Sequence, residues 1–428
     1  MNADTIFAVS SGAPPAAIAV LRISGPDAKR VATALAGSLP TPRYAALRQL
    51  NDPSDGSLLD SALVLVFEGP ATATGEDLVE LHLHGGRAVV TAVERVLSGQ
   101  PGLRRAEPGE FTRRALIAGR IDLTEAEGLG DLLSAETEAQ RRAAITAADG
   151  GIRRRIEDWS KRLLSVSARI EAELDFSDED DVEPLTIKAI KADIVVIAND
   201  IRSALDQPPV ERLRDGISVV LAGPPNSGKS TLLNAMAGYD AAIVSSIAGT
   251  TRDRIDVPVG RNGVAYRLTD TAGLAVDTDD PIEAIGIDRA RRAMETADIV
   301  FWLGDEAPPI EAVWIHARAD QAGREQKPTK AALAVSAKSE SGLPELWAYL
   351  ETKLGSLLPK ADEIAMNGRQ RGLLAEAVRN LEFGLRTEDI LLQAEGVRTA
   401  LGDLDRITGA SDTEAMLDVL FGKFCIGK

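Results

Sequence analysis

The sequence predicts three fold classes along one chain: α+β over residues 1–118, all-α over 119–210 and 361–428, and α/β over 211–360. Short β-type runs between Gly and Pro turns open the chain, and apolar residues at helical spacing follow without proline. From about residue 215, strand-like and helix-like runs alternate, as in a mostly parallel sheet. A length of 428 residues also favours two or three domains over a single core.

Three runs in the first region predict strands, namely AAIAVLRIS, SALVLVFEG and LVELHLH. The third alternates cleanly, with Val79, Leu81 and Leu83 on one face and Glu80 and two histidines on the other. Such strands mixed with helical runs are typical of an α+β domain.

The helical regions have recognisable ends. The acidic stretch DFSDEDDVEP predicts a solvated loop, and DQPPVERLRDG predicts a linker. In the last helix, Ser411 and Glu414 form a capping-box pattern, and Gly427 suits a left-handed helix stop. The apolar stripe of this helix consists of Leu417, Leu420, Phe421 and Phe424. We therefore expect a packed helix to tie down the end of the chain.

Composition restricts the classes of function. The net charge of −17, from 48 basic and 65 acidic residues, argues against wholesale wrapping of nucleic acid, so any RNA contact needs a local basic patch or a partner protein. No apolar run approaches the ~18–20 residues of a membrane span, and the first residues do not resemble a signal peptide. The single cysteine, Cys425, excludes an intrachain disulfide, and we expect a cytoplasmic protein without membrane contact.

The stretch VVLAGPPNSGKSTLLNAM carries the strongest signal in the chain. Gly223, Gly228, Lys229 and Ser230 satisfy G-x-x-x-x-G-K-[ST], between the buried-strand pattern ISVVLA and a helical run. Glycines at these places let backbone N–H groups surround phosphate, while the lysine reaches the β- and γ-phosphates and the serine holds Mg²⁺. A glycine-rich turn without function is the disfavoured alternative.

Three further motifs, GTTRD, DTAG and SAK, follow along the chain in the order found in GTPases. DTAG, residues 270–273, follows the strand-like VAYRL, where an Asp on the Mg²⁺ side and a γ-phosphate-sensing Gly belong. GTTRD, residues 249–253, lies where a switch loop with an Mg²⁺-binding Thr would sit. SAK, residues 336–338, follows AALAV, where it can support a guanine base. Each motif is weak alone, but four in order predict a GTPase.

Two positions depart from the usual GTPase motifs. Where N-K-x-D normally reads guanine, this chain has Ala317, Arg318, Ala319 and Asp320, so the Asp is kept and the Asn is lost. Asp320 can accept two hydrogen bonds from guanine, and we expect a guanine preference softer than in N-K-x-D enzymes. Leu274 stands where Ras-type enzymes carry a water-orienting Gln, so another group must orient the water.

These motifs converge on one family. Along essentially its whole length, the chain resembles the tRNA-modification GTPases called MnmE or TrmE. The resemblance rests on DTIFAVSSGAPPAAIAVLRISGP, TGEDLVELHLHGG, PGEFTRRALIAGRIDLTEAEGLGDLL, the phosphate loop, AAIVSSIAGTTRD, DTAGL, IGIDRAR and the terminal FCIGK. It implies an N-terminal folate-binding and dimerisation domain, an all-α helical domain, and a Ras-like α/β P-loop G domain inserted in the helical one.

The resemblance also implies a reaction and partners. Family members form homodimers and act with a FAD-dependent protein, GidA (MnmG), to install a carboxymethylaminomethyl-type group at C5 of the tRNA wobble uridine. A tetrahydrofolate derivative, 5-formyl or 5,10-methylene, supplies the one-carbon unit. GTP hydrolysis in the family requires Mg²⁺ and K⁺.

The family motifs, carried over residue by residue, predict the nucleotide contacts. The predicted GTP-binding residues are Asn226, Ser227, Gly228, Lys229, Ser230, Thr231, Ser245, Ser246, Ile247, Ala248, Gly249, Thr250, Thr251, Asp270, Thr271, Ala272, Gly273, Asp320, Ser336, Ala337 and Lys338. The predicted metal ligands are Ser230 and Thr251 for Mg²⁺, and Asn226, Ser245, Ile247 and Thr250 for K⁺. Taken alone, Asn226 would be interpreted as an ordinary loop residue. Together with the stretch SSIAGTTRD, it is interpreted as a K⁺ ligand.

The water-positioning group of the family is a glutamate just before an I-G-I stretch, which corresponds to Glu283. Glu283 is therefore the predicted catalytic residue of hydrolysis. Because LAVDTDDP is one residue longer than usual, Asp279 and Asp280 remain alternatives.

By resemblance, folate contacts fall on Arg22, Glu80, Arg120 and Lys428. One carboxylate can accept the adjacent N–H donors of a pterin edge, which makes Glu80 the anchor, and the basic groups suit the glutamate tail. Arg120 stands where the family usually has lysine, so the charge is kept but the geometry is not. The histidines beside Glu80 are interpreted as pocket lining rather than a metal site.

The remaining catalytic candidate is Cys425, expected at the last turn of its helix, where the resemblance implies that it faces the folate pocket. A thiolate there can act as nucleophile or base, and Lys428 would favour it. The alternative is a buried thiol packed beside Phe421 and Phe424. For the whole chain, a GTP-switched RNA-binding or ribosome-assembly factor is the rival function, and the intact phosphate loop disfavours a methyltransferase with a vestigial G domain.

Overall fold

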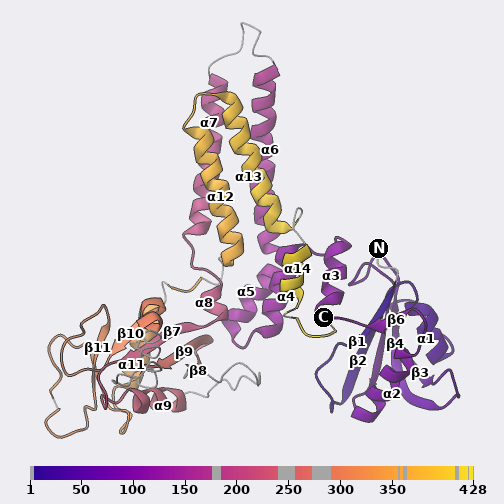
Figure 1. Cartoon of the computed structure of the whole chain (residues 1–428), viewed down its shortest axis with the longest axis horizontal. Helices are drawn as coiled ribbons and strands as arrows, with labels where there is room; N and C mark the ends of the chain where they lie inside the picture. The colour runs from indigo at the N-terminus through magenta and orange to yellow at the C-terminus, as the bar shows by residue number, and fades with distance from the viewer. Residues whose placement is uncertain are drawn as a thin grey trace, which may run out of the picture. The chain divides into compact units, whose positions relative to one another are not determined.

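The computed structural model describes residues 4–175, 185–239, 256–271, 291–324, 326–354, 357–359, 364–409, 414–422 and 424–427. The chain divides into two compact units. The first consists of Met1–Gly130 with Leu404–Lys428, and the second of Asp131–Asp403 (Figure 1). The domain boundaries expected at residues 118, 210 and 360 stay predictions.

The first unit is built on a six-stranded sheet in the order β3-β4-β5-β2-β1-β6. Neighbouring strands are antiparallel, except that β6 runs parallel to β1. The strands are β1 (Thr5–Val9), β2 (Ile18–Ser24), β3 (Ala46–Asn51), β4 (Leu58–Phe67), β5 (Leu78–His84) and β6 (Leu103–Arg105). The three predicted strands are confirmed as β2, β4 and β5.

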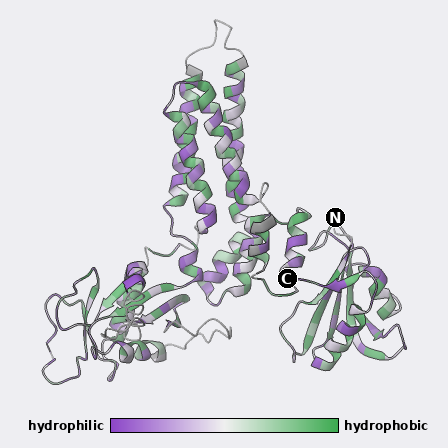
Figure 2. Cartoon of the chain, in the orientation of Figure 1, coloured by the Kyte–Doolittle hydropathy of each residue, from purple (hydrophilic) through white to green (hydrophobic). Residues whose placement is uncertain are grey.

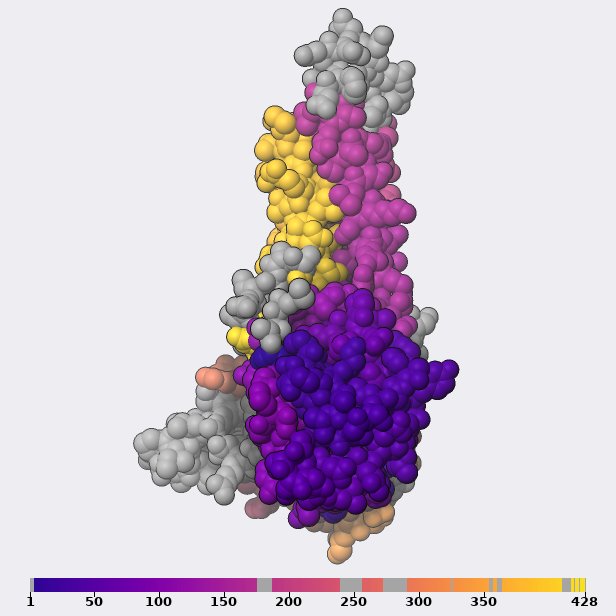
Figure 3. All heavy atoms as spheres, turned by 90° about the vertical axis from the view of Figure 1, so that its right-hand side faces the viewer, coloured from indigo at the N-terminus to yellow at the C-terminus, as the bar shows by residue number. Residues whose placement is uncertain are grey.

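The two faces of this sheet differ in polarity. Helices α1 and α2 pack on one face, where Val79, Leu81 and Leu83 of β5 join the main core. The opposite face carries Glu80, and Phe111 of α3 covers part of it in a second, smaller core. The helices here are α1 (Ala28–Ala36), α2 (Arg87–Ser98), α3 (Glu110–Ile117), α14 (Glu414–Phe421) and the start of α4 (Leu123–Ser134). The alternation predicted for LVELHLH is confirmed, and Figure 3 shows the N-terminal residues as a closely packed body.

The end of the chain returns to this sheet, but not as a helix. Helix α14 stops at Phe421, so the expectations that Cys425 lies at its last turn and that Gly427 stops it are wrong. The cause is a tertiary contact, because Ile426 instead forms an antiparallel bridge with Pro108. Gly427 has a φ of 95°, and a Cβ atom there would lie 2.2 Å from the carbonyl oxygen of Val9, so the close approach requires glycine.

The capping box and the apolar stripe predicted for the last helix have different outcomes. Ser411 of the expected capping box lies outside the described residues. Phe424, the last residue of the expected stripe, lies beyond the helix, so the stripe is wrong at that position, although the rings of Phe421 and Phe424 still pack at a centroid distance of 5.7 Å. Helix α14 therefore still anchors the chain's end, although the last residues extend beyond it.

The second unit contains another six-stranded sheet, in the order β12-β11-β10-β7-β9-β8. All neighbours are parallel except the β8–β9 pair. The strands are β7 (Ile217–Ala222), β8 (Asp256–Arg261), β9 (Val264–Asp270), β10 (Ile299–Trp302), β11 (Val313–Ala317) and β12 (Leu333–Val335). Helices around this sheet include α8 (Glu211–Arg214), α9 (Lys229–Tyr239) and α11 (Leu343–Leu354), and residues 291–296 are also helical. The alternating α/β pattern of this region is confirmed.

Long helices make up the rest of the second unit. They are α5 (Glu138–Ala148), α6 (Gly151–Asp175), α7 (Leu185–Leu205), α12 (Gly368–Leu385) and α13 (Ile390–Thr408), whose end belongs to the first unit. Thr137 and Asn367 cap α5 and α12 with reciprocal capping boxes. Figure 2 shows polar and apolar residues alternating around these helices and apolar residues concentrated in the strands. Within the described part of the chain, none of the helices combines the length and apolarity that crossing a bilayer demands.

Candidate functional site

The phosphate-loop motif begins at the end of β7, the fully buried central strand of the second sheet. The loop ends at Gly228, where α9 begins. Gly228 has a φ of 97°, and a Cβ atom there would meet the Arg318 side chain at 3.4 Å. Glycine is therefore required by the backbone conformation, and the backbone N–H groups at the start of α9 remain accessible to an anion.

Lys229 points back over this loop. Its Nζ donates hydrogen bonds to the carbonyl oxygens of Gly223 at 2.8 Å and Pro224 at 2.9 Å. Burial lowers the pKa of Lys229, and the negative charge of Asp270 opposes that effect. The side chain is thus held at the loop by weak neutral acceptors, which a phosphate oxygen can replace with a charge-assisted hydrogen bond.

Ser230 and Asp270 form the next pair. The hydroxyl of Ser230, in the first turn of α9, donates to the carboxylate of Asp270 at the end of β9. Thr271 beside it is buried and donates to the carbonyl oxygen of Leu221 at 2.9 Å, which fixes the end of β9 against β7. Hydroxyl and carboxylate oxygens are the ligand types that Mg²⁺ prefers, so this pair fits the ion.

The base-reading motif lies after β11. Asp320 accepts a hydrogen bond from the Ser336 hydroxyl at 2.7 Å, and the backbone N–H of Ser339 donates to the same hydroxyl oxygen at 3.1 Å. The Ser336 hydrogen bond is the main cause that lowers the pKa of Asp320 below its ordinary value. The carboxylate is therefore ionised at neutral pH and oriented by the SAK motif, a contact that the sequence analysis did not predict.

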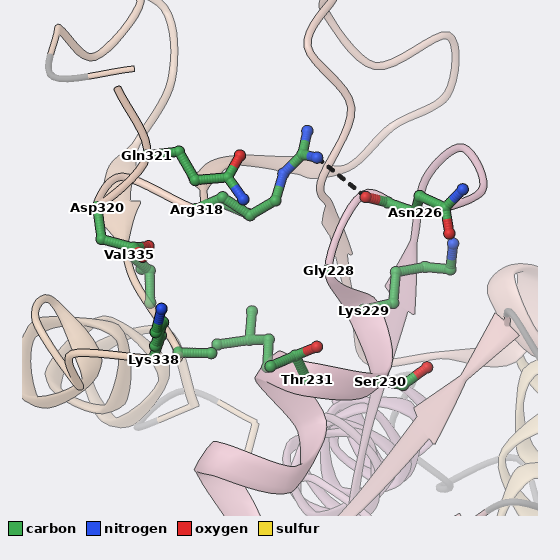
Figure 4. Close-up of a pocket in the computed structure, with 13 residues that line it drawn as sticks. Asn226, Gly228, Lys229, Ser230, Thr231, Arg318, Asp320, Gln321, Val335 and Lys338 are labelled. Carbon is green, nitrogen blue, oxygen red and sulfur yellow. Dashed lines mark hydrogen bonds between the residues drawn. The ribbon is translucent and has the colours of Figure 1, made fainter. Parts of the chain in front are cut away.

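The phosphate loop and the base-reading motif lie on opposite sides of one cavity of about 450 Å³. This volume is typical of small-molecule sites. In Figure 4, Lys229 and Ser230 lie on one side of this cavity and Asp320 and Lys338 on the other. The lining residues are Asn226, Gly228, Lys229, Ser230, Thr231, Leu232, Ala317, Arg318, Asp320, Gln321, Val335, Ala337 and Lys338. The structure thus brings together most of the predicted contacts of the phosphate loop and the base-reading motifs.

Several predicted residues cannot be placed. Those outside the described residues are Ser245, Ser246, Ile247, Ala248, Gly249, Thr250, Thr251, Ala272, Gly273 and Glu283, with its alternatives Asp279 and Asp280. Their roles stay predictions. Ser227 is described, and it is buried in the loop rather than lining the cavity.

Arg318 is a contact that the sequence analysis did not assign. Its guanidinium spans the cavity and donates to the carbonyl oxygen of Asn226 at 3.0 Å (Figure 4). It therefore connects the base-reading loop to the phosphate loop. The sequence feature that could have predicted this contact is the position of Arg318 in the motif, because it stands where N-K-x-D has its lysine.

A second polar group lies on the open face of the first sheet. Arg22 of β2 and Glu80 of β5 are direct cross-strand partners, and the Arg22 Nε donates to Glu80 at 2.8 Å. His82 lies 3.3 Å from the other carboxylate oxygen of Glu80. His84 instead lies 2.7 Å from the carboxylate of Asp60, so the two histidines have different partners.

The other predicted folate contacts do not join this pair directly. Arg120 donates through its Nε to the carbonyl oxygen of Thr72 at 3.1 Å. Cys425 has an exposed side chain, so the alternative of a buried thiol is wrong. Its carbonyl oxygen accepts a hydrogen bond from the Gly109 N–H at 3.4 Å, and Lys428 lies outside the described residues.

Two protein-family models match most of this chain. Residues 5–120 match the family model described as the GTP-binding protein TrmE N-terminus, and residues 123–425 match that of the MnmE helical domain. The chain belongs to the MnmE (TrmE) family. The family predicted from the motifs is therefore confirmed.

Full-length relatives agree with this assignment. The tRNA modification GTPase MnmE of Erythrobacter litoralis is 54% identical over 426 residues, which cover 99% of this chain and 100% of the relative. The MnmE proteins of Rhizorhabdus wittichii and Zymomonas mobilis are 54% and 49% identical, each over 99% of this chain and over 97% and 100% of their own lengths. Among solved structures, the G domain of the T. maritima FeoB iron transporter covers 32% of this chain and 98% of its own length at 21% identity, with a TM-score of 0.24 that carries no argument.

Proposed function

We propose that this MnmE-family GTPase acts in the modification of tRNA, as the names of its relatives state for them. In this proposal it forms a homodimer and works with the FAD-dependent GidA (MnmG) protein. Together they install a carboxymethylaminomethyl-type group at C5 of the wobble uridine, using a tetrahydrofolate one-carbon unit. GTP hydrolysis depends on Mg²⁺ and K⁺.

The observation that carries the nucleotide part is the shared cavity. A phosphate loop on one side and an ionised, oriented Asp320 on the other define the two ends of a nucleotide. Asp320 accepts from the N–H groups of guanine, and the Lys229 ammonium binds the phosphates. The Ser230 hydroxyl and the Asp270 carboxylate, now hydrogen-bonded to each other, would hold Mg²⁺, with Thr251 as a further ligand. The ion, when bound, neutralises charge on the phosphate oxygens.

Two further groups complete the hydrolytic site in this proposal. Glu283 orients the attacking water, since Leu274 cannot. Asn226, with Ser245, Ile247 and Thr250, holds K⁺ at the phosphates, where a cation does the work of an arginine finger. The presence of Asn226 among the residues that line the cavity supports this assignment.

We expect hydrolysis to require K⁺, because the motifs supply an asparagine in the phosphate loop and no evident arginine finger. GTP turnover should be measured in K⁺ and in Na⁺ at equal ionic strength. A clear loss of turnover in Na⁺ is the expected result, with partial activity in Rb⁺ and NH₄⁺, which are similar in size to K⁺. Equal rates in K⁺ and Na⁺ would contradict the assignment of Asn226.

Guanine should be preferred over adenine, although less strongly than in enzymes with N-K-x-D. Adenine offers no donors that match the Asp320 carboxylate, whereas guanine offers two adjacent N–H groups. Competition of ATP against labelled GTP measures the preference directly. Equal affinity for ATP and GTP would show that Asp320 does not read the base.

The polar pair on the first sheet supports the folate part. Glu80 already accepts from Arg22 and faces His82, yet its two oxygens offer about four acceptor positions in all, so it can also accept pterin N–H groups. Arg22, Arg120 and Lys428 would face the carboxylates of the folate tail. Next to the pair, Leu47 and Leu63 are cross-strand partners with exposed side chains. An exposed apolar group of this kind supports a partner subunit on this face.

Two measurements test the proposal as a whole. Mass spectrometry of tRNA wobble nucleosides from cells lacking the protein should show loss of the carboxymethylaminomethyl-type group. Calorimetry with a tetrahydrofolate separates this function from its rival, a GTP-switched RNA-binding factor. Normal nucleosides together with no folate binding would favour the rival.

A further inference from the structure

The base-reading loop lacks the asparagine that normally braces it, and the structure contains another brace. The loop runs from Ala317 at the end of β11 to Arg324. The Nε of Arg324 donates to the carbonyl oxygen of Ala317 at 3.1 Å. In return, the Nε2 of His316 lies 2.9 Å from the carbonyl oxygen of Arg324, and since a carbonyl only accepts, the histidine donates. Two hydrogen bonds therefore close the loop at its base.

An acidic residue from a different part of the sheet holds the arginine of this closure. Asp305 follows β10 and forms an ion pair with the NH1 of Arg324. The hydrogen bond from Arg324 is the first cause that lowers the pKa of Asp305. Asp305 also lies 3.6 Å from the NH2 of Arg318, the residue that crosses the nucleotide cavity. One carboxylate thus connects the base of the loop with the cavity wall.

These contacts bear on Asp320, which lies inside the closed loop. Ser336, directly after β12, orients the Asp320 carboxylate, and the backbone N–H of Ala319 donates to the carbonyl oxygen of Val335 at the end of β12 at 3.2 Å. Those contacts tie the first part of the loop to β12 and the residue after it, while within the loop the Gln321 N–H donates to the Arg318 carbonyl oxygen and the Arg324 N–H to that of Gln321. Arg324 holds the second part, and its side chain is 17% exposed, so its hydrogen bond to the Ala317 carbonyl oxygen is partly shielded from water.

We propose that Arg324 is the positioning residue of the base-reading loop and replaces the missing asparagine. It sets the place of Asp320 through the Ala317 carbonyl and Asp305, and it does not touch the nucleotide. This inference rests on the proposed role of Asp320 in reading guanine. It accounts for how a loop with Ala317 in the motif can still select a base.

The test compares GDP with inosine diphosphate, which lacks the 2-amino group that Asp320 would bind. In the full-length protein, Arg324→Ala should raise the Kd for GDP about tenfold, which corresponds to about 1.4 kcal/mol of binding free energy, because Asp320 is no longer held in place. The Kd for inosine diphosphate should rise less. The preference for GDP, expressed as the ratio of the Kd for inosine diphosphate to the Kd for GDP, therefore falls. In GTP turnover the effect should appear in KM rather than kcat. Arg324→Lys keeps the charge and should restore part of the ratio.

One control variant and one second test variant identify the cause. Arg261, at the end of β8 on the opposite edge of the sheet, has a side chain that is 18% exposed and pairs with Glu351, so Arg261→Ala removes an equally buried arginine far from the loop. It should leave the ratio unchanged. Asp305 is 64% exposed, so Asp305→Asn should fold normally, and it should lower the ratio in the same direction as Arg324→Ala.

Asp320→Asn separates the inference from the function on which it rests. If Asp320→Asn lowers the ratio while Arg324→Ala and Asp305→Asn do not, the positioning role is wrong and Asp320 still reads guanine. If Asp320→Asn leaves the ratio unchanged, the base-reading role fails and the inference fails with it. A melting temperature for each variant detects misfolding, and if Arg324→Ala does not fold, Asp305→Asn decides the question.

Discussion

Replacing Lys229 with alanine should lower kcat/KM for GTP about 10²–10³-fold, the cost typical of removing one preorganised donor from a site of developing charge. Its ammonium is buried and is held at the phosphate loop by the carbonyl oxygens of Gly223 and Pro224. Those neutral acceptors exchange easily for phosphate oxygens, so the donor is in place before the nucleotide arrives. Steady-state GTP hydrolysis by the purified protein measures the effect.

The control removes a lysine from the same sheet region without touching the loop. Lys353 lies in the last turn of α11, so Lys353→Ala changes the net charge equally. The kcat/KM of the Lys353→Ala variant should stay within about twofold of the wild-type value, as expected for a surface substitution. Lys229→Ala turning over GTP at a near-normal rate, with a normal melting temperature, would falsify the assignment of the phosphate site.

The phosphate loop could be predicted from the sequence because its geometry is local. Gly228 has a backbone conformation that favours glycine, and Lys229 and Ser230 follow directly on the first turn of α9. The buried strand before the loop is visible as a continuous apolar run. Asp320 could be placed for a similar reason, because it follows a strand at the same edge of the parallel sheet.

The closure by Arg324 could not be predicted in this way. It depends on a side chain from the loop after β11 meeting Asp305 from the loop after β10, and no spacing rule connects those two residues. The chain's end illustrates a different limit. Its apolar stripe continues at helical spacing to Phe424, yet the helix stops at Phe421 because Ile426 pairs with Pro108. Tertiary contacts override local propensity there.

The exposed thiol of Cys425 leads to the prediction with the largest expected effect on tRNA. Cys425→Ser should abolish modification of the wobble uridine while leaving GTP hydrolysis nearly intact, because the residue lies outside the nucleotide cavity. Serine keeps the size of the side chain but supplies almost no anion at neutral pH, whereas a thiol can ionise. Mass spectrometry of wobble nucleosides from complemented cells gives the readout.

A structural effect of Cys425→Ser is not expected, because the main chain fixes this segment. The Gly109 N–H donates to the Cys425 carbonyl oxygen, and the Ser10 hydroxyl donates to the Gly427 carbonyl oxygen at 2.8 Å. Neither contact involves the sulfur. Ile426 also has an exposed side chain on the same segment, so Ile426→Ala changes the tail without changing the thiol and should leave modification normal. Normally modified tRNA in Cys425→Ser cells would mean that the thiol takes no part in the reaction, whatever else the terminal segment binds.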